Sequence, residues 1–235
     1  RIILPAMRWP HIPLAGSKAL LARFDGKSGL EVGGPSRFFR AGEHLPLYSR
    51  IRSLDNCNYA CETFWEGALV EGDFRLDGKV VGRQYICEAT DVASRLTGKS
   101  YDFVISSNCL EHVANPLAAV EAWLAVLRPG GTLLLVLPNK RSNFDRRRQV
   151  TAFEHLLSDY ANAVGEDDAT HFPEVINQTD LRLTLKWQVA DINAFRQIVL
   201  RNFENRRAHH HVFNEALLAR IAAHFGLEAV QTVDA

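Results

Sequence analysis

Three polar residues follow the short apolar run 103–105: Asn108, Glu111 and His112. The side chains of Glu111 and His112 can take part in acid–base chemistry. An imidazole titrates near neutral pH, so His112 is our first candidate for a catalytic base. The alternative for His112 is a structural hydrogen bond at the start of the following helix. We expect Glu111 to orient a neighbouring group.

A run of three histidines, His209 to His211, is the second place where the sequence offers a base. In an extended chain His209 and His211 face one side and His210 faces the other. We therefore take His209 and His211 as further catalytic candidates. The alternative is that the three rings satisfy backbone groups beneath a lid.

Oxygen and imidazole ligands that suit a divalent cation are also dense in one stretch: Glu166, Asp167, Asp168, His171 and Glu174. No ligand motif of fixed spacing accompanies them, so we assign no metal site from the sequence. The basic run 146–148 could hold an anionic acceptor. Its alternative is a solvated surface.

A glycine turn follows the predicted strand that begins at Leu30. Gly33 and Gly34 let the backbone approach a ligand closely, and the next helical start, after Ser36, offers free N–H groups. The turn does not match G-x-G-x-x-G, so a dinucleotide fingerprint is a poor description. Taken alone, it could also be only a tight turn.

Two acidic residues follow the next predicted strands. Asp55 comes after 51–54, at a distance from the glycine turn that suits hydrogen bonds to ribose hydroxyls. Asp91 comes after 84–87 and could accept a hydrogen bond from an exocyclic amine of adenine. The alternatives are a turn-forming role for Asp55 and a helix cap for Asp91.

These residues need a scaffold, and the stretch 101–139 predicts one. It is typical of a βαβ unit, with a helix that Asn115 caps, a stop at Pro129-Gly130-Gly131 and a buried strand over 132–137. Loops at the carboxyl ends of parallel strands are where α/β proteins bind ligands. The polar loop 106–112 lies at such an end.

The segments LEVGGPS, ATD, YDFVISSNCLEH and LRPGGTLLLVLPN resemble the class I S-adenosylmethionine-dependent methyltransferases, in particular the methyltransferase type 11 group. With GGPS and HHHVF the chain is similar to a bacterial subset of that group. Gly-Pro-Ser replaces the later positions of the usual E/D-x-G-x-G-x-G motif. The resemblance implies a Rossmann-like, doubly wound, mostly parallel α/β sheet and S-adenosylmethionine as cofactor. The residues it assigns to cofactor binding are Glu31, Gly33, Gly34, Ser36, Asp55, Thr90, Asp91, Val92, Ser107 and Asn108.

The resemblance also implies a seven-stranded sheet with the order 3-2-1-4-5-7-6. The stretch 228–233 is predicted to be strand six, and no sequence after it could form strand seven. Either residues are missing or the sheet is completed in another way. We expect missing residues, because a bare central edge would expose unpaired backbone groups.

We predict that residues 1–235 form a single methyltransferase domain. Within it, 141–208 is predicted to form an inserted helical lid or acceptor-binding region. Within it we expect helices over 150–160 and 191–203 and a strand or extended arm over 181–187. Asn214 and Gly226 bound a further helix over 215–225.

The amino-acid composition limits the classes of partner that the protein is expected to bind. Lys+Arg and Asp+Glu number 27 each, so no net charge favours nucleic acid or an anionic membrane. Prolines interrupt the first residues, so we predict no export signal, and no apolar run reaches the roughly 18 residues of a membrane span. The four cysteines form no paired C-x-x-C, which is typical of reduced thiols and a cytoplasmic protein. A homodimer is possible.

These observations predict transfer of a methyl group to a hydroxyl of a small molecule or glycan. The alternatives are N-methylation of an amine and a non-catalytic protein that binds S-adenosylmethionine. An NAD-dependent dehydrogenase is the main rival with a similar fold. The sequence does not identify the acceptor.

Overall fold

The computed structural model describes residues 2–4, 17–184, 191–229 and 233–234. The chain divides into two compact units. Unit 1 contains Arg1–Ala6, Asn108–Ala118 and Val136–Ala235, and unit 2 contains Met7–Ser107 and Ala119–Leu135. The predicted insert 141–208 falls wholly within unit 1 and remains a prediction as a separate region.

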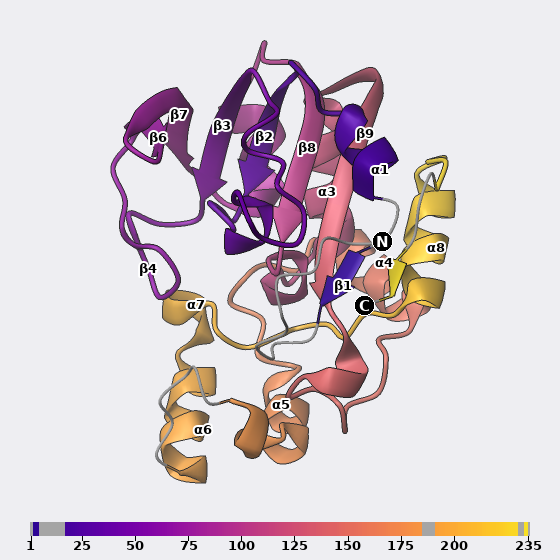
Figure 1. The fold of residues 1–235 in the computed structure, drawn as a ribbon. Coiled ribbons are helices and arrows are strands. Elements are labelled where there is room, and N and C mark those ends of the chain that lie inside the picture. Colours follow the sequence, from indigo (N-terminus) through magenta and orange to yellow (C-terminus); the bar gives the residue numbers. More distant parts are fainter. Residues whose placement is uncertain (1, 5–16, 185–190, 230–232, 235) are drawn as a thin grey trace. The chain divides into compact units, whose positions relative to one another are not determined.

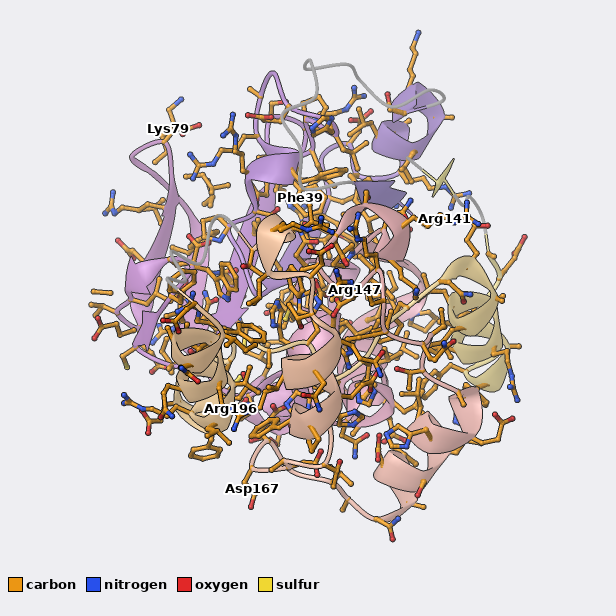
Figure 2. The ribbon with its side chains drawn as sticks, turned by 90° about the horizontal axis from the view of Figure 1, so that it is seen from below. Phe39, Lys79, Arg141, Arg147, Asp167 and Arg196 are labelled. Carbon is orange, nitrogen blue, oxygen red and sulfur yellow. The ribbon has the colours of Figure 1, made fainter. Side chains whose placement is uncertain are left out.

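A mostly parallel sheet forms the centre of unit 2 (Figure 1). Its strands, in spatial order, are β9 (Leu127–Pro138), β8 (Tyr101–Ser107), β2 (Ser28–Val32), β3 (Ser53–Asn58), β7 (Lys79–Ile86) and β6 (Gly72–Leu76). β8, β2, β3 and β7 pair in parallel, and β6 adds an antiparallel edge. Lys79, labelled in Figure 2, lies at the tip of the β6–β7 hairpin. This arrangement confirms the predicted Rossmann-like fold class.

The strands of unit 2 are apolar on both faces, as expected for a covered parallel sheet. Leu30, Leu54 and Val104 are completely buried. Short helices connect the strands. They are α1 (Ser17–Ala22), η1 (Arg37–Phe39), η2 (Ala89–Asp91) and α2 (Val92–Arg95), and a small hairpin is formed by β4 (Glu62–Thr63) and β5 (Gly67–Ala68).

The helix of the predicted βαβ unit is α3 (Pro116–Ala125). Asn115 caps it as predicted, because its Oδ1 accepts a hydrogen bond of 3.1 Å from Ala118 N. The helix ends earlier than predicted. β9 begins at Leu127, so Pro129-Gly130-Gly131 lies inside the strand segment instead of forming the turn before it. Gly130, with φ of 74°, provides the left-handed backbone that the bend requires.

Unit 1 contains the strand that the sequence could not locate. β1 (Ile2–Leu4) lies between β10 (Val233–Asp234) and the last residues of β9 and is parallel to both. Ile2 pairs with Val233 on one side and with Val136 on the other. This is the position that family order gives to strand seven. A strand from the beginning of the given sequence therefore completes the sheet in another way, which was the second of our two alternatives.

The other elements of unit 1 are helical: η3 (Leu110–His112), η4 (Lys140–Ser142), α4 (Phe153–Ala161), α5 (Phe172–Gln178), η5 (Leu181–Leu183), α6 (Ile192–Leu200), α7 (Asn202–Asn205) and α8 (Glu215–His224). The predicted helices over 150–160, 191–203 and 215–225 are confirmed. The predicted arm over 181–187 is wrong at 181–184, where η5 and its C-cap Thr184 lie, and 185–187 lie outside the described residues.

An apolar cluster joins α5 and α6, which lie side by side in Figure 1. Phe172, Val175, Phe195 and Val199 form its buried centre. No helix among the described residues is long and apolar enough to cross a membrane.

Candidate functional site

Glu31 organises the glycine turn at the end of β2 in unit 2. Its side chain is completely buried. Oε1 accepts hydrogen bonds from Ser36 N at 3.0 Å and from the Tyr48 hydroxyl, which also lies 2.7 Å from Oε2. Burial raises the pKa of Glu31 to about 7, although both hydrogen bonds favour the charged form. Nothing in the sequence pattern pointed to Tyr48.

The turn itself admits no side chain at Gly34. A Cβ built there would lie 2.1 Å from Glu31 Cδ. Gly33, with φ of 81°, has the left-handed conformation that favours glycine. The buried amides of Asn56 and Asn58 both donate to Gly34 O, at 3.0 and 2.9 Å. The backbone of the turn is therefore held from two sides.

Asn56 and Asn58 were missed by the sequence reasoning. Both lie on β3, two residues apart, so their side chains leave the same face of the strand. Asn56 Nδ2 also donates to Gln84 Oε1 on β7. The sequence feature that could have identified them is a pair of amide side chains at alternate positions of a predicted buried strand.

Two buried polar atoms of unit 2 have no hydrogen-bond partner: Asn56 Oδ1 and Ser107 Oγ. Ser107 ends β8, and the pairing of β2 with β8 places Ser106 beside Val32, next to the glycine turn. Unpaired buried polar atoms are rare in proteins. Their presence at the carboxyl ends of parallel strands fits a polar ligand such as a nucleoside cofactor.

Asp55 lies elsewhere on β3. The strand continues to Asn58, so the prediction that it ends at Asp55 is wrong. Asp55 Oδ2 accepts a hydrogen bond of 2.7 Å from the Tyr101 hydroxyl, and Oδ1 accepts one of 2.8 Å from Arg83 N. Tyr101 begins β8, whereas the glycine turn adjoins its end. The structure therefore gives no support to a ribose-binding role for Asp55.

Thr90, Asp91 and Val92 follow the carboxyl end of β7, where the sequence placed them. They form the end of η2 and the start of α2. The Trp123 Nε1 donates to Ala89 O at 2.9 Å and anchors this turn. Asp91 is exposed, and its side chain makes no capping hydrogen bond to α2. The remaining predicted cofactor residues are Ser36, whose Oγ caps η1, and Asn108, an exposed residue of unit 1 with φ of 50°.

In unit 1, the predicted base His112 is buried on η3 together with Glu111. His112 Nδ1 lies 3.2 Å from Ala208 O, and a carbonyl only accepts, so Nδ1 carries the proton. Burial holds the pKa of His112 well below its usual range. Burial also raises the pKa of Glu111 to about 7, and neither of its oxygens accepts a hydrogen bond.

A carboxylate–imidazole pair lies beside them. His209 Nδ1 is 2.5 Å from Asp145 Oδ2, and His209 Nε2 is 4.0 Å from Glu111 Oε1. Burial alone would raise the pKa of Asp145, but His209 and Arg148 outweigh burial and lower it. The carboxylate therefore stays charged and orients the imidazole. Glu111, His112 and His209 also bring three possible metal-ligand atoms within 4.8 Å of one another.

Arg148 fixes the backbone of the histidine run. Its guanidinium is buried, pairs with Asp145 at 2.9 Å and donates to the carbonyls of His209 and His210 at 2.8 and 3.0 Å. The other two arginines of the basic run, Arg146 and Arg147, form ion pairs with Asp180. Of the three arginines, only Arg148 is buried, and no sequence pattern predicted its pairing with Asp145.

His209 and His211 both line a small cavity of unit 1, whose other walls include Glu111, Asn143, Asp145 and Phe213. Their partners differ. His209 contacts Asp145, whereas His211 is completely buried with its ring beside those of His155 and His171. The cavity brings the predicted catalytic residues His209 and His211 to one place.

Comparisons with known proteins match the chain to methyltransferases. Residues 13–232 match a family model described as a methyltransferase domain. Ubiquinone biosynthesis O-methyltransferases from strains B100 and 8004 of Xanthomonas campestris pv. campestris are each 30% identical over 96 residues. This match covers 41% of the chain and 37% of each relative, so the chain matches well under half of their length.

Two solved structures are similar to the chain at low sequence identity. One is a Bacillus halodurans C-125 protein assigned as a methyltransferase, with 12% identity, a TM-score of 0.41 and coverage of 90% of this chain and 64% of that one. The other is coclaurine N-methyltransferase bound to N-methylheliamine and SAH, with 11% identity, a TM-score of 0.33 and coverage of 88% and 74%.

Proposed function

Because this chain belongs to the family of methyltransferase domains, we propose that it transfers a methyl group from S-adenosylmethionine to a hydroxyl of a small molecule or glycan. The observation that carries the hydroxyl preference is the Asp145–His209 pair. A hydroxyl must lose its proton to attack the methyl group, whereas a neutral amine needs less help. An imidazole that a buried carboxylate orients is suited to that task.

The donor-binding residues are proposed in unit 2. The turn at Gly33 and Gly34 follows the carboxyl end of β2, and Ser107 Oγ and Asn56 Oδ1 are buried polar atoms that need partners. Thr90 to Val92 would lie along the nucleoside. The bound donor supplies an electrophilic methyl group on a sulfonium, so the protein mainly aligns donor and acceptor.

His209 is better suited than His112 to act as the catalytic base. With Nδ1–H donated to Asp145, His209 keeps its Nε2 lone pair available, and the ring lines the cavity. His112 has the lowered pKa of a buried ring, which makes it a weak base. We propose that His112 packs against His209, since the two ring centroids are 4.5 Å apart, and so helps to position it.

Turnover with labelled S-adenosylmethionine and a panel of phenols, sugars and amines tests the proposal. His209→Gln and Asp145→Asn should each lower kcat on a hydroxyl acceptor about 10²–10⁴-fold. The Kd for S-adenosylhomocysteine, measured by calorimetry, should stay unchanged. His224→Gln, on α8 of the same unit, is the matched control and should retain full turnover.

Other outcomes would contradict it. Turnover of amines alone, insensitive to His209→Gln, would indicate an N-methyltransferase. Binding of S-adenosylhomocysteine without turnover of any acceptor would indicate a non-catalytic binding protein. Tight binding of NAD in place of S-adenosylhomocysteine would reject the donor itself.

A further inference from the structure

Four possible metal ligands from three separate segments of unit 1 converge on one point. His155 and Asp159 lie four residues apart on α4 and so share one helix face. His171 precedes α5, and His211 lies in the segment between α7 and α8. One ligand atom from each residue lies within 4.8 Å of all the others.

The distances between these atoms match a coordination sphere. His155 Nε2 is 3.2 Å from His171 Nε2 and 3.3 Å from Asp159 Oδ2. A tetrahedral ion with bonds of about 2.0–2.1 Å separates adjacent ligand atoms by about 3.3 Å. His211 Nε2 is 3.7 Å from Asp159 Oδ2. That nitrogen also lies 2.9 Å from Ala114 O and, because a carbonyl only accepts, it carries the proton when no ion is bound. Metal binding at Nε2 therefore requires the ring to move this proton to Nδ1, which has no hydrogen-bond partner.

The cluster is poorly satisfied without an ion. Asp159 Oδ2 is buried and accepts no hydrogen bond. The two facing nitrogens of His155 and His171 can share only one proton between them. A buried carboxylate oxygen without a partner is costly. A cation at the centre would satisfy the carboxylate and the imidazole lone pairs together.

A neighbouring group of Asp168, His171 and His210 is less suitable. Asn202 Oδ1 accepts from Ala208 N, which fixes the amide, so Asn202 Nδ2 donates to His210 Nε2. His210 therefore carries its proton on Nδ1, the nitrogen that faces Asp168 at 3.9 Å. A protonated nitrogen cannot be a ligand, and His210 cannot move this proton to Nε2 while Asn202 donates to that nitrogen.

We propose that His155, Asp159, His171 and His211 bind one divalent transition-metal ion of the Zn²⁺ class. Three imidazoles and one carboxylate are a ligand set that Zn²⁺ accepts in tetrahedral geometry and that Mg²⁺ and Ca²⁺ do not favour. The ion ties α4, the start of α5 and the histidine run together. The His155 side chain, 42% exposed, gives the ion a route from solvent. This inference does not rest on the proposed methyl transfer.

The test is metal binding by the full chain, purified without a histidine tag. Elemental analysis should find one Zn²⁺ per chain, and chelated protein should take up one Co²⁺ with the strong visible absorption of a four-coordinate site. Asp159→Asn and His171→Gln should each weaken Zn²⁺ binding by at least about 100-fold, more than the loss of an outer partner of a ligand costs. At free Zn²⁺ of about 100 times Kd, Tm should rise by about 5–10 °C.

Two further variants keep the test decisive. His224→Gln removes a histidine of the same unit that belongs to none of the ligand groups, and its Zn²⁺ affinity should equal that of the wild type. His112→Gln disrupts the Glu111 group. Loss of the bound ion in His112→Gln but not in Asp159→Asn would place the metal elsewhere and overturn the proposal. Wild-type protein that contains no stoichiometric metal and takes up neither Co²⁺ nor Zn²⁺ would also overturn the proposal. Circular dichroism of each variant checks that the fold is retained.

Discussion

Glu31 is a residue whose ionisation near neutral pH is tied to the fold of unit 2. Its pKa rises from 4.5 to about 7 because it is buried. The folded state therefore holds a proton that the unfolded state has released between these two values. Stability from this group is fully present below pH 4.5 and is lost as the pH rises to 7.

Glu31→Gln should remove this pH dependence. The wild type should lose on the order of 3 kcal/mol more free energy of unfolding than the variant between pH 4.5 and 7. The variant keeps an amide oxygen for Ser36 N and Tyr48, so it should fold. Urea unfolding of both proteins at several pH values measures the difference, and parallel curves would show that Glu31 is ionised in the folded protein.

Arg148 is the residue on which the histidine run depends. Arg148→Met leaves Asp145 as an uncompensated buried charge and removes two hydrogen bonds to backbone carbonyls. We expect a loss of about 3–5 kcal/mol in the free energy of unfolding. The control is Arg147→Met, whose exposed side chain should change stability by no more than about 0.5 kcal/mol. Equal effects in urea unfolding would contradict the buried role.

At the residue scale, titratable residues and glycines could be singled out from the sequence, whereas the residues that hydrogen-bond to them could not. The resemblance pointed to Glu31, and residue type and position pointed to His209 and the glycines. Tyr48 and Asp145 were not predicted, because each reaches its partner from a segment remote in the chain, 17 and 64 residues away. The strand that contains Asp55 ends three residues later than its apolar run suggested.

Among the elements, the glycine turn between β2 and η1 has little tolerance for an added side chain. Gly34→Ala would place a methyl group 2.1 Å from Glu31 Cδ, and the buried carboxylate cannot move aside. We expect a loss of about 1–3 kcal/mol in stability and at least tenfold weaker binding of S-adenosylhomocysteine.

Gly165→Ala is the control for this substitution. Its Cβ would meet only the end of the Asp167 side chain, which can rotate away. Its thermal unfolding and calorimetric titration should match those of the wild type. A Gly34→Ala variant that binds the donor product normally would show that the turn is not part of the donor site.

The elements themselves were largely predictable, because period and capping are local properties. α3, α4 and α8 follow from apolar spacing and, for α3 and α8, from an asparagine cap. The end of α3 was misplaced because Pro-Gly-Gly was taken as a turn, whereas the backbone accommodates it within β9. β1 pairs with strands that lie far from it in the sequence, β9 and β10, and no local sequence pattern predicts such a pairing.

For the whole molecule, β1 is the element that joins the beginning of the chain to its end within unit 1. Ile3→Pro would remove a backbone N–H from a strand that has neighbours on both sides. We expect a loss of about 1–3 kcal/mol and faster hydrogen exchange in 136–137 and 233–234. β2 and β3 should exchange as before.

Ile3→Val keeps the N–H and should behave as the wild type does in the same exchange experiment. Unchanged exchange at residues 136 and 137 in Ile3→Pro would show that β1 does not complete the sheet in solution.

The Arg148 contacts have one more consequence. They hold the backbone of His209 and His210, and His211 follows directly, so the proposed base and the proposed metal ligand share one restrained strip of chain. Restraint of this strip by one ligand changes the free energy at which the other binds. Thermodynamic linkage makes this effect reciprocal. The factor by which Zn²⁺ changes the acceptor's Kd must equal the factor by which the acceptor changes that of Zn²⁺, so two independent titrations should return the same value.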